Sequence, residues 1–162
     1  MSVLKEFAQK WCHPDDLPQP VEPSTIADAE RALGVVFPED YKSAVIEDGL
    51  PHPTAALLDN LEQAGSEIHD LSDLLKPAEI AATTKDWRAA GLPSNLVIFG
   101  NDCMGNCFCF DENDLRAGPV PSSPIYFWDH DFDETKRIAP SFRDWIGSYL
   151  GSWSTGISYK DF

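Results

Sequence analysis

The sequence predicts a single α+β domain in which a central antiparallel β-sheet is flanked by helices from the N- and C-terminal parts of the chain. Three observations predict this class. Strand-like runs gather between residues 96 and 129, helix-period patterns lie on both sides of them, and glycine- or proline-rich turns separate the segments. The chain has 162 residues and 43% hydrophobic content, which suits one domain with one core.

The strand signal consists of three short runs. Leu96–Phe99 is apolar, and Cys107–Phe110 alternates, which would place its two phenylalanines on one face and its two cysteines on the other. Residues 101–106 between them are rich in Asn, Asp and Gly, the residue types that favour a tight reversal. Ile125–Asp129 follows a proline-containing loop over 111–123. We expect two or three adjacent antiparallel strands here.

Helical spacing of apolar residues, with start or stop signals, predicts helices over residues 3–12, 25–33, 38–48, 77–90 and 142–150. The last is the clearest, because Ser141 and Asp144 form a capping box in front of an apolar stripe that includes Phe142 and Trp145. Residues 55–61 fit either a helical turn or a strand, and residues 68–71 are predicted as a short strand.

The positions of proline and glycine along the chain predict how it is organised. Residues 1–23 would form a helix and a proline-rich connector packed on the domain, residues 24–150 the domain itself, and residues 151–162 a tail. The tail carries Trp153, Tyr159 and Phe162 without a regular period. It would either fold back over the sheet or present an exposed apolar edge.

Charge and composition narrow the classes of function. The chain has 27 acidic and 12 basic residues and a formal net charge of −15, so a basic nucleic-acid interface is not expected. No apolar run is long enough for a membrane helix, no secretory h-region opens the chain, and we expect a cytoplasmic protein with four reduced cysteines. The excess of acidic residues either only keeps the protein soluble or also attracts a basic protein partner.

Cys103, Cys107 and Cys109 invite a zinc interpretation. Their C-x3-C-x-C spacing is poor for one tetrahedral site, because only Cys107 and Cys109 would share a strand face and the fourth ligand would have to be distant. We therefore expect small buried or half-buried thiols, and neither a metal nor a cofactor.

Asp129, Asp131 and Asp133 resemble the beginning of a calcium loop. An EF-hand needs Gly at the sixth position and Glu at the twelfth, and Glu134 and Pro140 stand there instead. These carboxylates are interpreted as an acidic strand end rather than as an EF-hand.

His130 stands between two aspartates and could act as a general base in a hydrolase. The sequence offers no nucleophile motif to accompany it, and no phosphate- or dinucleotide-binding loop. We expect instead that His130 ties down a loop, with no catalytic residue in the chain.

An ordered set of motifs carries a family resemblance. It comprises I-A-D-A-E-R-A-L-G from Ile26, F-P-E-D-Y-K from Phe37, E-D-G ending at Gly49, I-F-G-N-D-C-M-G-N from Ile98, F-C-F-D ending at Asp111, P-I-Y-F-W-D-H-D from Pro124 and I-A-P-S-F-R-D-W-I from Ile138. In this order, over roughly residues 25–150, the chain resembles the Smi1/Knr4 (SUKH) superfamily. Asp48-Gly49 and Gly105-Asn106 replace that family's usual Asn-Gly and Gly-Asp and preserve the turn chemistry.

The resemblance implies a small α+β domain without catalytic activity. Bacterial members typically act as immunity proteins that bind and neutralise polymorphic toxins, often nucleases, and a fungal relative is a regulatory scaffold. It therefore implies a cognate toxin domain, expected to be basic, as the partner, with the scaffold role as the alternative. The candidate contact residues are Asp102, Asp129, Asp131, Asp133 and Glu134.

Overall fold

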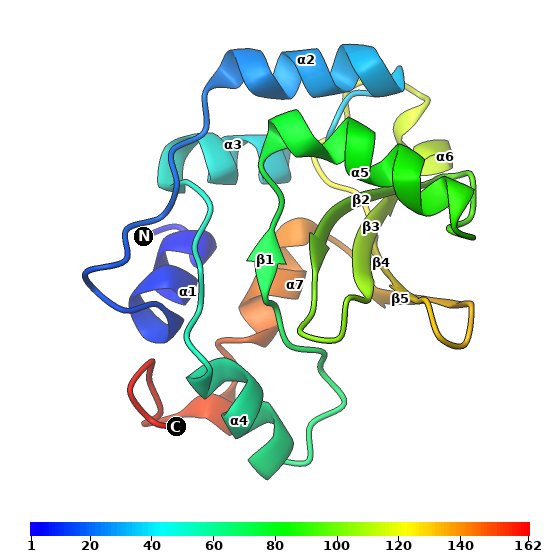
Figure 1. Cartoon of the computed structure of the whole chain (residues 1–162). Helices are drawn as coiled ribbons and strands as arrows, with labels where there is room; N and C mark the ends of the chain where they lie inside the picture. The colour runs from blue at the N-terminus through cyan, green and yellow to red at the C-terminus, as the bar shows by residue number, and fades with distance from the viewer.

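The computed structural model describes all 162 residues and contains a five-stranded antiparallel sheet with seven α-helices around it (Figure 1). The elements run in the order α1 (Val3–Trp11), α2 (Pro23–Leu33), α3 (Glu39–Asp48), α4 (Ala56–Gln63), β1 (Asp73–Leu74), α5 (Pro77–Ala89), β2 (Leu96–Asn101), β3 (Cys107–Asp111), α6 (Glu112–Leu115), β4 (Ile125–Asp129), β5 (Glu134–Ala139) and α7 (Phe142–Ser148), followed by a 3-10 turn at Ser152–Ser154. The predicted α+β class is confirmed.

The sheet is a meander in which the strands lie side by side in sequence order, β1 to β5. The turn from β2 to β3 and the turn from β4 to β5 lie at the same end of the sheet, because every neighbouring pair is antiparallel. Cys107 at the start of β3 is paired with Trp128 near the end of β4, so these two turns are neighbours.

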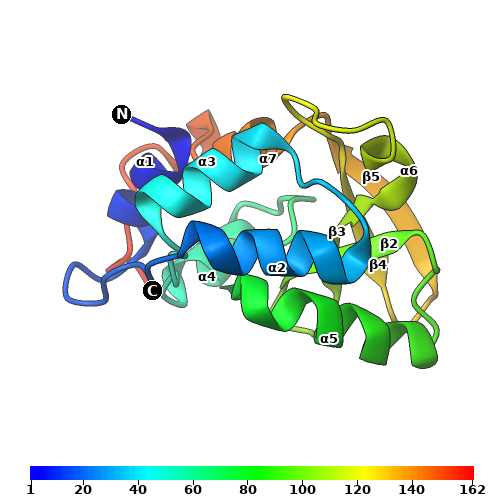
Figure 2. The ribbon, with the colours of Figure 1, turned by 90° about the horizontal axis from the view of Figure 1, so that it is seen from above.

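The two faces of the sheet have separate cores, as the alternation in β3 predicts. Phe108 and Phe110 belong to the main core with α7, whereas Cys107 and Cys109 belong to a smaller cluster under α5. Figure 2 shows α2 lying alongside α5, between it and α3 in the view from above. The sheet is therefore covered on both faces in the region of β2, β3 and β4.

Helix α7 shows how the local sequence places an element on the sheet. Ser141 Oγ accepts a hydrogen bond from the backbone N–H of Asp144 at 3.0 Å, so the predicted capping box caps the helix. Phe142 and Trp145 are each only 2% exposed, and the Trp145 ring lies 4.7 Å from that of Phe108. The apolar stripe of the helix thus faces the sheet.

Three segments differ from the expectation, and a fourth was left open by the sequence. The strand predicted at 68–71 is wrong, because the short β1 forms at Asp73–Leu74 instead. Residues 55–61, whose pattern fitted either a helical turn or a strand, lie almost entirely in helix α4 (Ala56–Gln63). The predicted loop over 111–123 begins with the short helix α6. The sequence did not predict strand β5, because its first four residues are all exposed and it has no alternation of apolar and polar residues.

The chain termini pack against each other. Trp11 of α1 stacks on Trp153 with ring centroids 5.7 Å apart, and the backbone N–H of Tyr159 donates to the carbonyl of Lys10 at 2.7 Å. Asn60 Nδ2 of α4 donates to the carbonyl of Asp161 at 2.6 Å. The tail therefore folds back over α1 and α4 rather than over the sheet.

None of the helices combines the length and the apolar character that crossing a membrane requires.

Candidate functional site

The turn between β4 and β5 holds most of the candidate residues. Asp129 and Glu134 are cross-strand partners, and four residues join them. Asp129 Oδ1 accepts hydrogen bonds from the backbone N–H groups of Asp131 at 2.9 Å and Phe132 at 3.2 Å, which closes the turn. Asp133 has a φ of 50°, a left-handed conformation that Asp tolerates better than most residues. Its Oδ1 accepts from Trp128 Nε1 at 3.1 Å.

The neighbouring turn between β2 and β3 is organised around Asp102. This carboxylate is 5% exposed, and its Oδ1 accepts from the backbone N–H groups of Met104 at 2.9 Å and Asn106 at 2.8 Å. Its Oδ2 accepts from Asn106 Nδ2 at 3.2 Å. Asp102 therefore satisfies three donors of its own turn, and its charge is directed inward.

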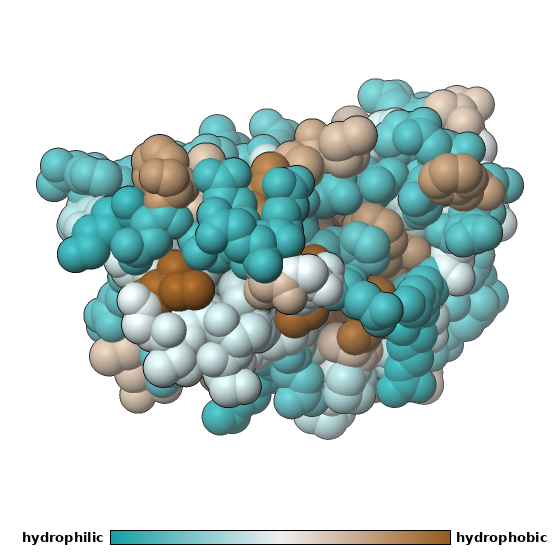
Figure 3. Space-filling model, turned by 90° about the horizontal axis from the view of Figure 1, so that it is seen from below, coloured by the Kyte–Doolittle hydropathy of each residue, from teal (hydrophilic) through white to brown (hydrophobic).

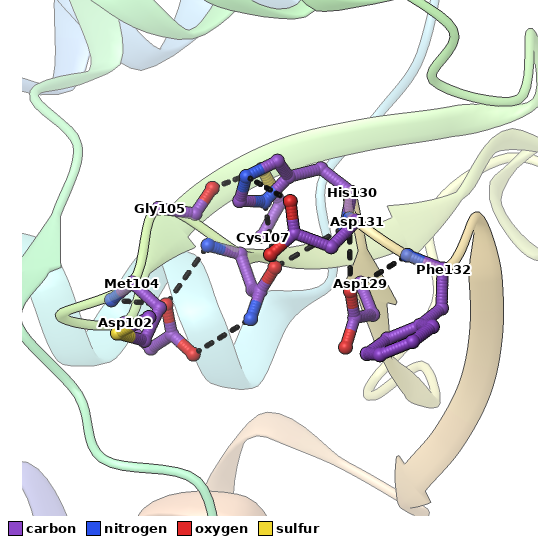
Figure 4. A network of polar contacts seen from close by, with 9 residues as sticks. Asp102, Met104, Gly105, Cys107, Asp129, His130, Asp131 and Phe132 are labelled. Carbon is purple, nitrogen blue, oxygen red and sulfur yellow. Dashed lines mark hydrogen bonds and ion pairs between the residues drawn. The ribbon is translucent and has the colours of Figure 1, made fainter.

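One amide side chain joins the two turns (Figure 4). Asn106 Oδ1 accepts the backbone N–H of His130 at 3.2 Å and lies 2.7 Å from His130 Nδ1. The other ring nitrogen of His130, Nε2, lies 3.4 Å from Asp131 Oδ1. The two hairpin ends are thus held in a fixed relation by side-chain contacts as well as by the sheet.

Two large apolar side chains protrude from this end of the sheet. Phe132 is 76% exposed and Met104 is 68% exposed, one on each turn. We call the surface formed by Met104, Asp129, Asp131, Phe132, Asp133 and Glu134 the hairpin-tip surface. It combines an exposed aromatic ring with four carboxylates, and such rings are frequent anchors in protein interfaces.

The structure brings four of the five candidate residues together on one turn: Asp129, Asp131, Asp133 and Glu134. Asp102 lies on the adjoining turn, but its buried carboxylate supports the turn rather than facing outward. Sequence reasoning missed Phe132 and Met104. The available signal for Phe132 was an aromatic residue flanked by aspartates in a segment too short to bury it.

The segment that precedes β1 supports the same end of the sheet. The His69 ring stacks on Phe127 of β4 with centroids 3.6 Å apart, and Asp70 Oδ2 accepts the backbone N–H of Cys103 at 3.1 Å. Burial lowers the pKa of His69 and raises the pKa of Asp70. Two buried or half-buried ionisable groups therefore stand directly beneath the turns.

The cysteines lie in different environments. Cys107 and Cys109 are buried under α5, whereas Cys103 is exposed on the β2–β3 turn. Burial raises the pKa of Cys107 to about 12, and partial burial together with the Asp70 and Asp102 carboxylates raises the pKa of Cys103 to about 11, so both thiols stay protonated near neutral pH. No three His, Cys, Asp or Glu side chains in the chain are grouped so that they could hold a metal ion.

The contacts of His130 bear on the hydrolase hypothesis. Its two ring nitrogens face the Asn106 amide and the Asp131 carboxylate, and its ring lies 5.6 Å from that of Trp87. None of these partners is a hydroxyl or thiol that a base could activate. The geometry therefore suits a residue that fixes a turn, as the sequence led us to expect.

The surface seen from below in Figure 3 is mostly hydrophilic, and its apolar residues form small separate patches. A hydrophilic surface of this kind, on a chain with a net charge of −15, favours recognition through charge with isolated apolar anchors over a broad apolar interface.

Comparison with known proteins agrees with the resemblance noted in the sequence. No curated protein matches the chain significantly. The family described as SMI1 / KNR4 (SUKH-1) matches residues 20–148, which is most of the chain and includes the whole sheet and α2 to α7. The chain therefore belongs to the SMI1/KNR4 family (SUKH-1).

Proposed function

We propose that this protein is a non-catalytic, cytoplasmic immunity protein that binds a cognate toxin domain with a basic surface and neutralises it by occlusion. The observation that carries the proposal is the hairpin-tip surface, where an exposed Phe132 stands among four carboxylates on a turn held by side-chain hydrogen bonds. Membership of the SMI1/KNR4 family supports it, because bacterial members typically have this role.

The physical argument has two parts. A net charge of −15 attracts a cationic partner over a distance, which raises the association rate and weakens with salt. Close contact then depends on apolar side chains that become buried, and Phe132 costs little to present because its turn is already fixed by Asp129. Occlusion of a toxin needs no catalytic group, only a complementary surface.

The first experiment identifies the partner and tests its nature. The purified chain serves as bait, and each captured protein is expressed alone in cells. We expect one captured protein to arrest growth, and co-expression of this chain to restore growth at a one-to-one ratio. Captured proteins that are harmless, or whose toxicity is unaffected by this chain, would contradict the immunity role.

The second experiment tests the surface with charge reversal. Asp131→Lys with Glu134→Lys replaces two negative charges by two positive ones and leaves intact Asp129 and Asp133, which hold the turn and Trp128. Stopped-flow association with the captured toxin should slow by about tenfold at low salt and lose most of its salt dependence. Glu6→Lys with Glu62→Lys makes the same change of net charge at exposed helical sites elsewhere.

The control pair should slow association much less than the hairpin-tip pair. An equal effect of both pairs would show that only the net charge matters. An association rate insensitive to both pairs and to salt would remove the electrostatic account altogether.

The third experiment separates the aromatic anchor from the charges. Phe132→Ala should leave the association rate nearly unchanged and raise the dissociation rate by roughly tenfold or more, because a buried apolar contact is lost. Phe162, which is 72% exposed on the tail, provides the matched control as Phe162→Ala. Equal dissociation rates for the two variants would exclude Phe132 from the interface.

A further inference from the structure

A second surface lies far from the hairpin-tip surface, on the side of the molecule formed by α1 and the connector that follows it. Figure 1 shows α1 at the left and the β4–β5 hairpin at the right. A hollow of about 490 Å³ opens here, between α1, the connector and the C-terminal end of α3. It is lined by Lys5, Ala8, Gln9, Cys12, His13 and other residues of the connector, together with Glu47, Asp48 and Tyr159.

The walls of this hollow are fixed at several points. The connector is tied to the end of α3 by two backbone hydrogen bonds between Gln19 and Leu50, at 3.0 and 2.8 Å. Before the connector, the carbonyl of Trp11 accepts from the backbone N–H of Thr54 at 2.8 Å. Four prolines between residues 13 and 23 restrict the connector further. The hollow is therefore a preformed feature of the fold.

The charges that line the hollow are unbalanced. Asp16 and Glu47 are exposed and their carboxylates make no hydrogen bond or ion pair, whereas Asp48 accepts from the hydroxyl of Ser2. Lys5 makes no ion pair with any of them, although it lines the same hollow. Two carboxylates with unused acceptor capacity thus stand at the mouth of a partly apolar cavity.

Apolar groups complete the lining. Leu17 projects from the connector and is 74% exposed, and Ala8 lies on the facing side of α1. A second hollow of about 360 Å³ shares Asp16 and Leu17 with the first. It also includes Glu79, Lys76 and Asp73, whose Oδ1 lies 2.9 Å from Nδ1 of His52. Leu17 therefore stands on a ridge between two hollows that each carry acidic side chains.

We propose that this ridge and its two hollows bind an extended basic segment of a partner polypeptide. An Arg or Lys side chain of that segment would enter the larger hollow, with its charged head at Asp16 and Glu47 and its aliphatic stem on Leu17 and Ala8. Long basic side chains combine an apolar stem with a charged head in this way. A polypeptide fits better than a lone cation, because two acidic hollows flank one apolar ridge.

This site is separate from the hairpin-tip surface. The larger hollow is lined by nine residues between Lys5 and Pro18, which precede the part of the chain that matches the family, by Glu47 and Asp48 from the matched part, and by the tail residue Tyr159. One carboxylate of the proposed site, Asp16, therefore lies outside the matched part of the chain, and the other, Glu47, lies inside it.

The test uses the full chain and a defined probe. The ¹⁵N-labelled protein is titrated with a blocked pentapeptide that contains two arginines separated by glycine, and with a matched peptide in which citrulline replaces arginine. We expect saturable amide shifts at Ala8, Leu17 and Glu47 with a Kd on the order of 1 mM for the arginine peptide. The uncharged citrulline peptide should cause no saturable shift at these residues.

The variant Asp16→Asn with Glu47→Gln should raise the Kd of the arginine peptide at least fivefold, because both carboxylates are lost and neither supports the fold. The control Glu62→Gln with Glu67→Gln removes two exposed charges on α4 and the loop after it, and should leave the Kd unchanged. Equal binding by the citrulline peptide, equal Kd values in both variants, or shifts confined to residues 129–134 would overturn the proposal.

The result does not depend on the immunity role. The probe needs no toxin, so the peptide can bind here even if no toxin partner exists, and a confirmed toxin that ignores Asp16 and Glu47 would leave the hairpin-tip proposal standing.

Discussion

His130 and Asn106 connect the β2–β3 turn and the β4–β5 turn: the Nδ1 atom of the histidine lies 2.7 Å from the Oδ1 atom of the amide. The Nδ2 group of Asn106 donates to Asp102, which fixes Oδ1 as the acceptor. The network therefore assigns the proton of neutral His130 to Nδ1, and leaves Nε2 facing Asp131.

Asn106→Ala should separate the two turns while leaving the fold intact. The substitution removes the acceptor for the backbone N–H and Nδ1 of His130 and one donor to Asp102, so we expect a loss of about 1–3 kcal/mol in unfolding free energy. Hydrogen exchange of the His130 amide should become faster. Asn113→Ala on the exposed surface of α6 is the control, and similar exchange in both variants would contradict the coupling.

Trp145 anchors α7 against the sheet. Its ring packs on Phe99 and Phe108 and is 2% exposed, so Trp145→Ala should lower the unfolding free energy by about 3–5 kcal/mol in a urea titration. Phe132→Ala, at an exposed position, should change it by less than about 0.5 kcal/mol. A loss below about 1 kcal/mol for Trp145→Ala would show that the helix is not held by this ring.

Three glycines form a graded test of backbone requirements. A Cβ at Gly49, which has a φ of 78°, would lie 2.7 Å from the carbonyl oxygen of Gln19, so Gly49→Ala should cost more than about 2 kcal/mol. Gly34 also has a positive φ but open space around it, and Gly34→Ala should cost about 1 kcal/mol. Gly147→Ala, in the open face of α7, should stabilise by about 0.5–1 kcal/mol. Thermal or urea unfolding would give the order, and a Gly49 variant as stable as the Gly34 variant would contradict the close approach.

The stability of the protein should depend on the ionisation of His69. Burial lowers the pKa of His69 below its ordinary value of about 6.5, so the folded state prefers the neutral ring. The stability from this site is present above the unfolded pKa and is lost as the pH falls toward the folded pKa. The charged groups that face His69 are Lys136, which also lowers its pKa, and Asp70, Asp102 and Asp129, which oppose the shift.

His69→Phe isolates this effect. The new ring keeps the stacking on Phe127, and the hydrogen bond from the Tyr149 hydroxyl goes to the backbone carbonyl of residue 69 and is retained. Between about pH 7.5 and pH 5.5 the wild type should lose more unfolding free energy than this variant. His13→Phe at an exposed site is the control. Parallel stability curves for the wild type and His69→Phe would exclude the buried histidine as the cause.

The sequence predicted most of the fold because local rules and tertiary packing agree in most elements. The capping box at Ser141 and the alternation in β3 each reappear as observed contacts. Strand β5 was not predicted because it lies at the edge of the sheet with both faces largely exposed, so its sequence has no periodic apolar residues. β1 was misplaced because a two-residue strand depends on its partner Asn101–Gly100 rather than on its own sequence.

The candidate site was predicted less completely. The acidic residues of the β4–β5 turn were recognisable from their composition, and the structure places four of them on one turn. The inward direction of Asp102 and the outward direction of Phe132 depend on turn geometry that residue types alone do not specify. The Asn106–His130 contact joins residues 24 positions apart and requires the register of β3 against β4.

The position of β5 at the end of the sheet has a consequence for self-association. A terminal strand presents unpaired backbone donors and acceptors to any second sheet, which is a common route to aggregation. Lys136 and Arg137 stand exposed on this strand in a chain that otherwise carries mostly negative charge. If two copies paired antiparallel with these residues opposite each other, the cations would be brought together, and we expect their repulsion to oppose pairing through this edge.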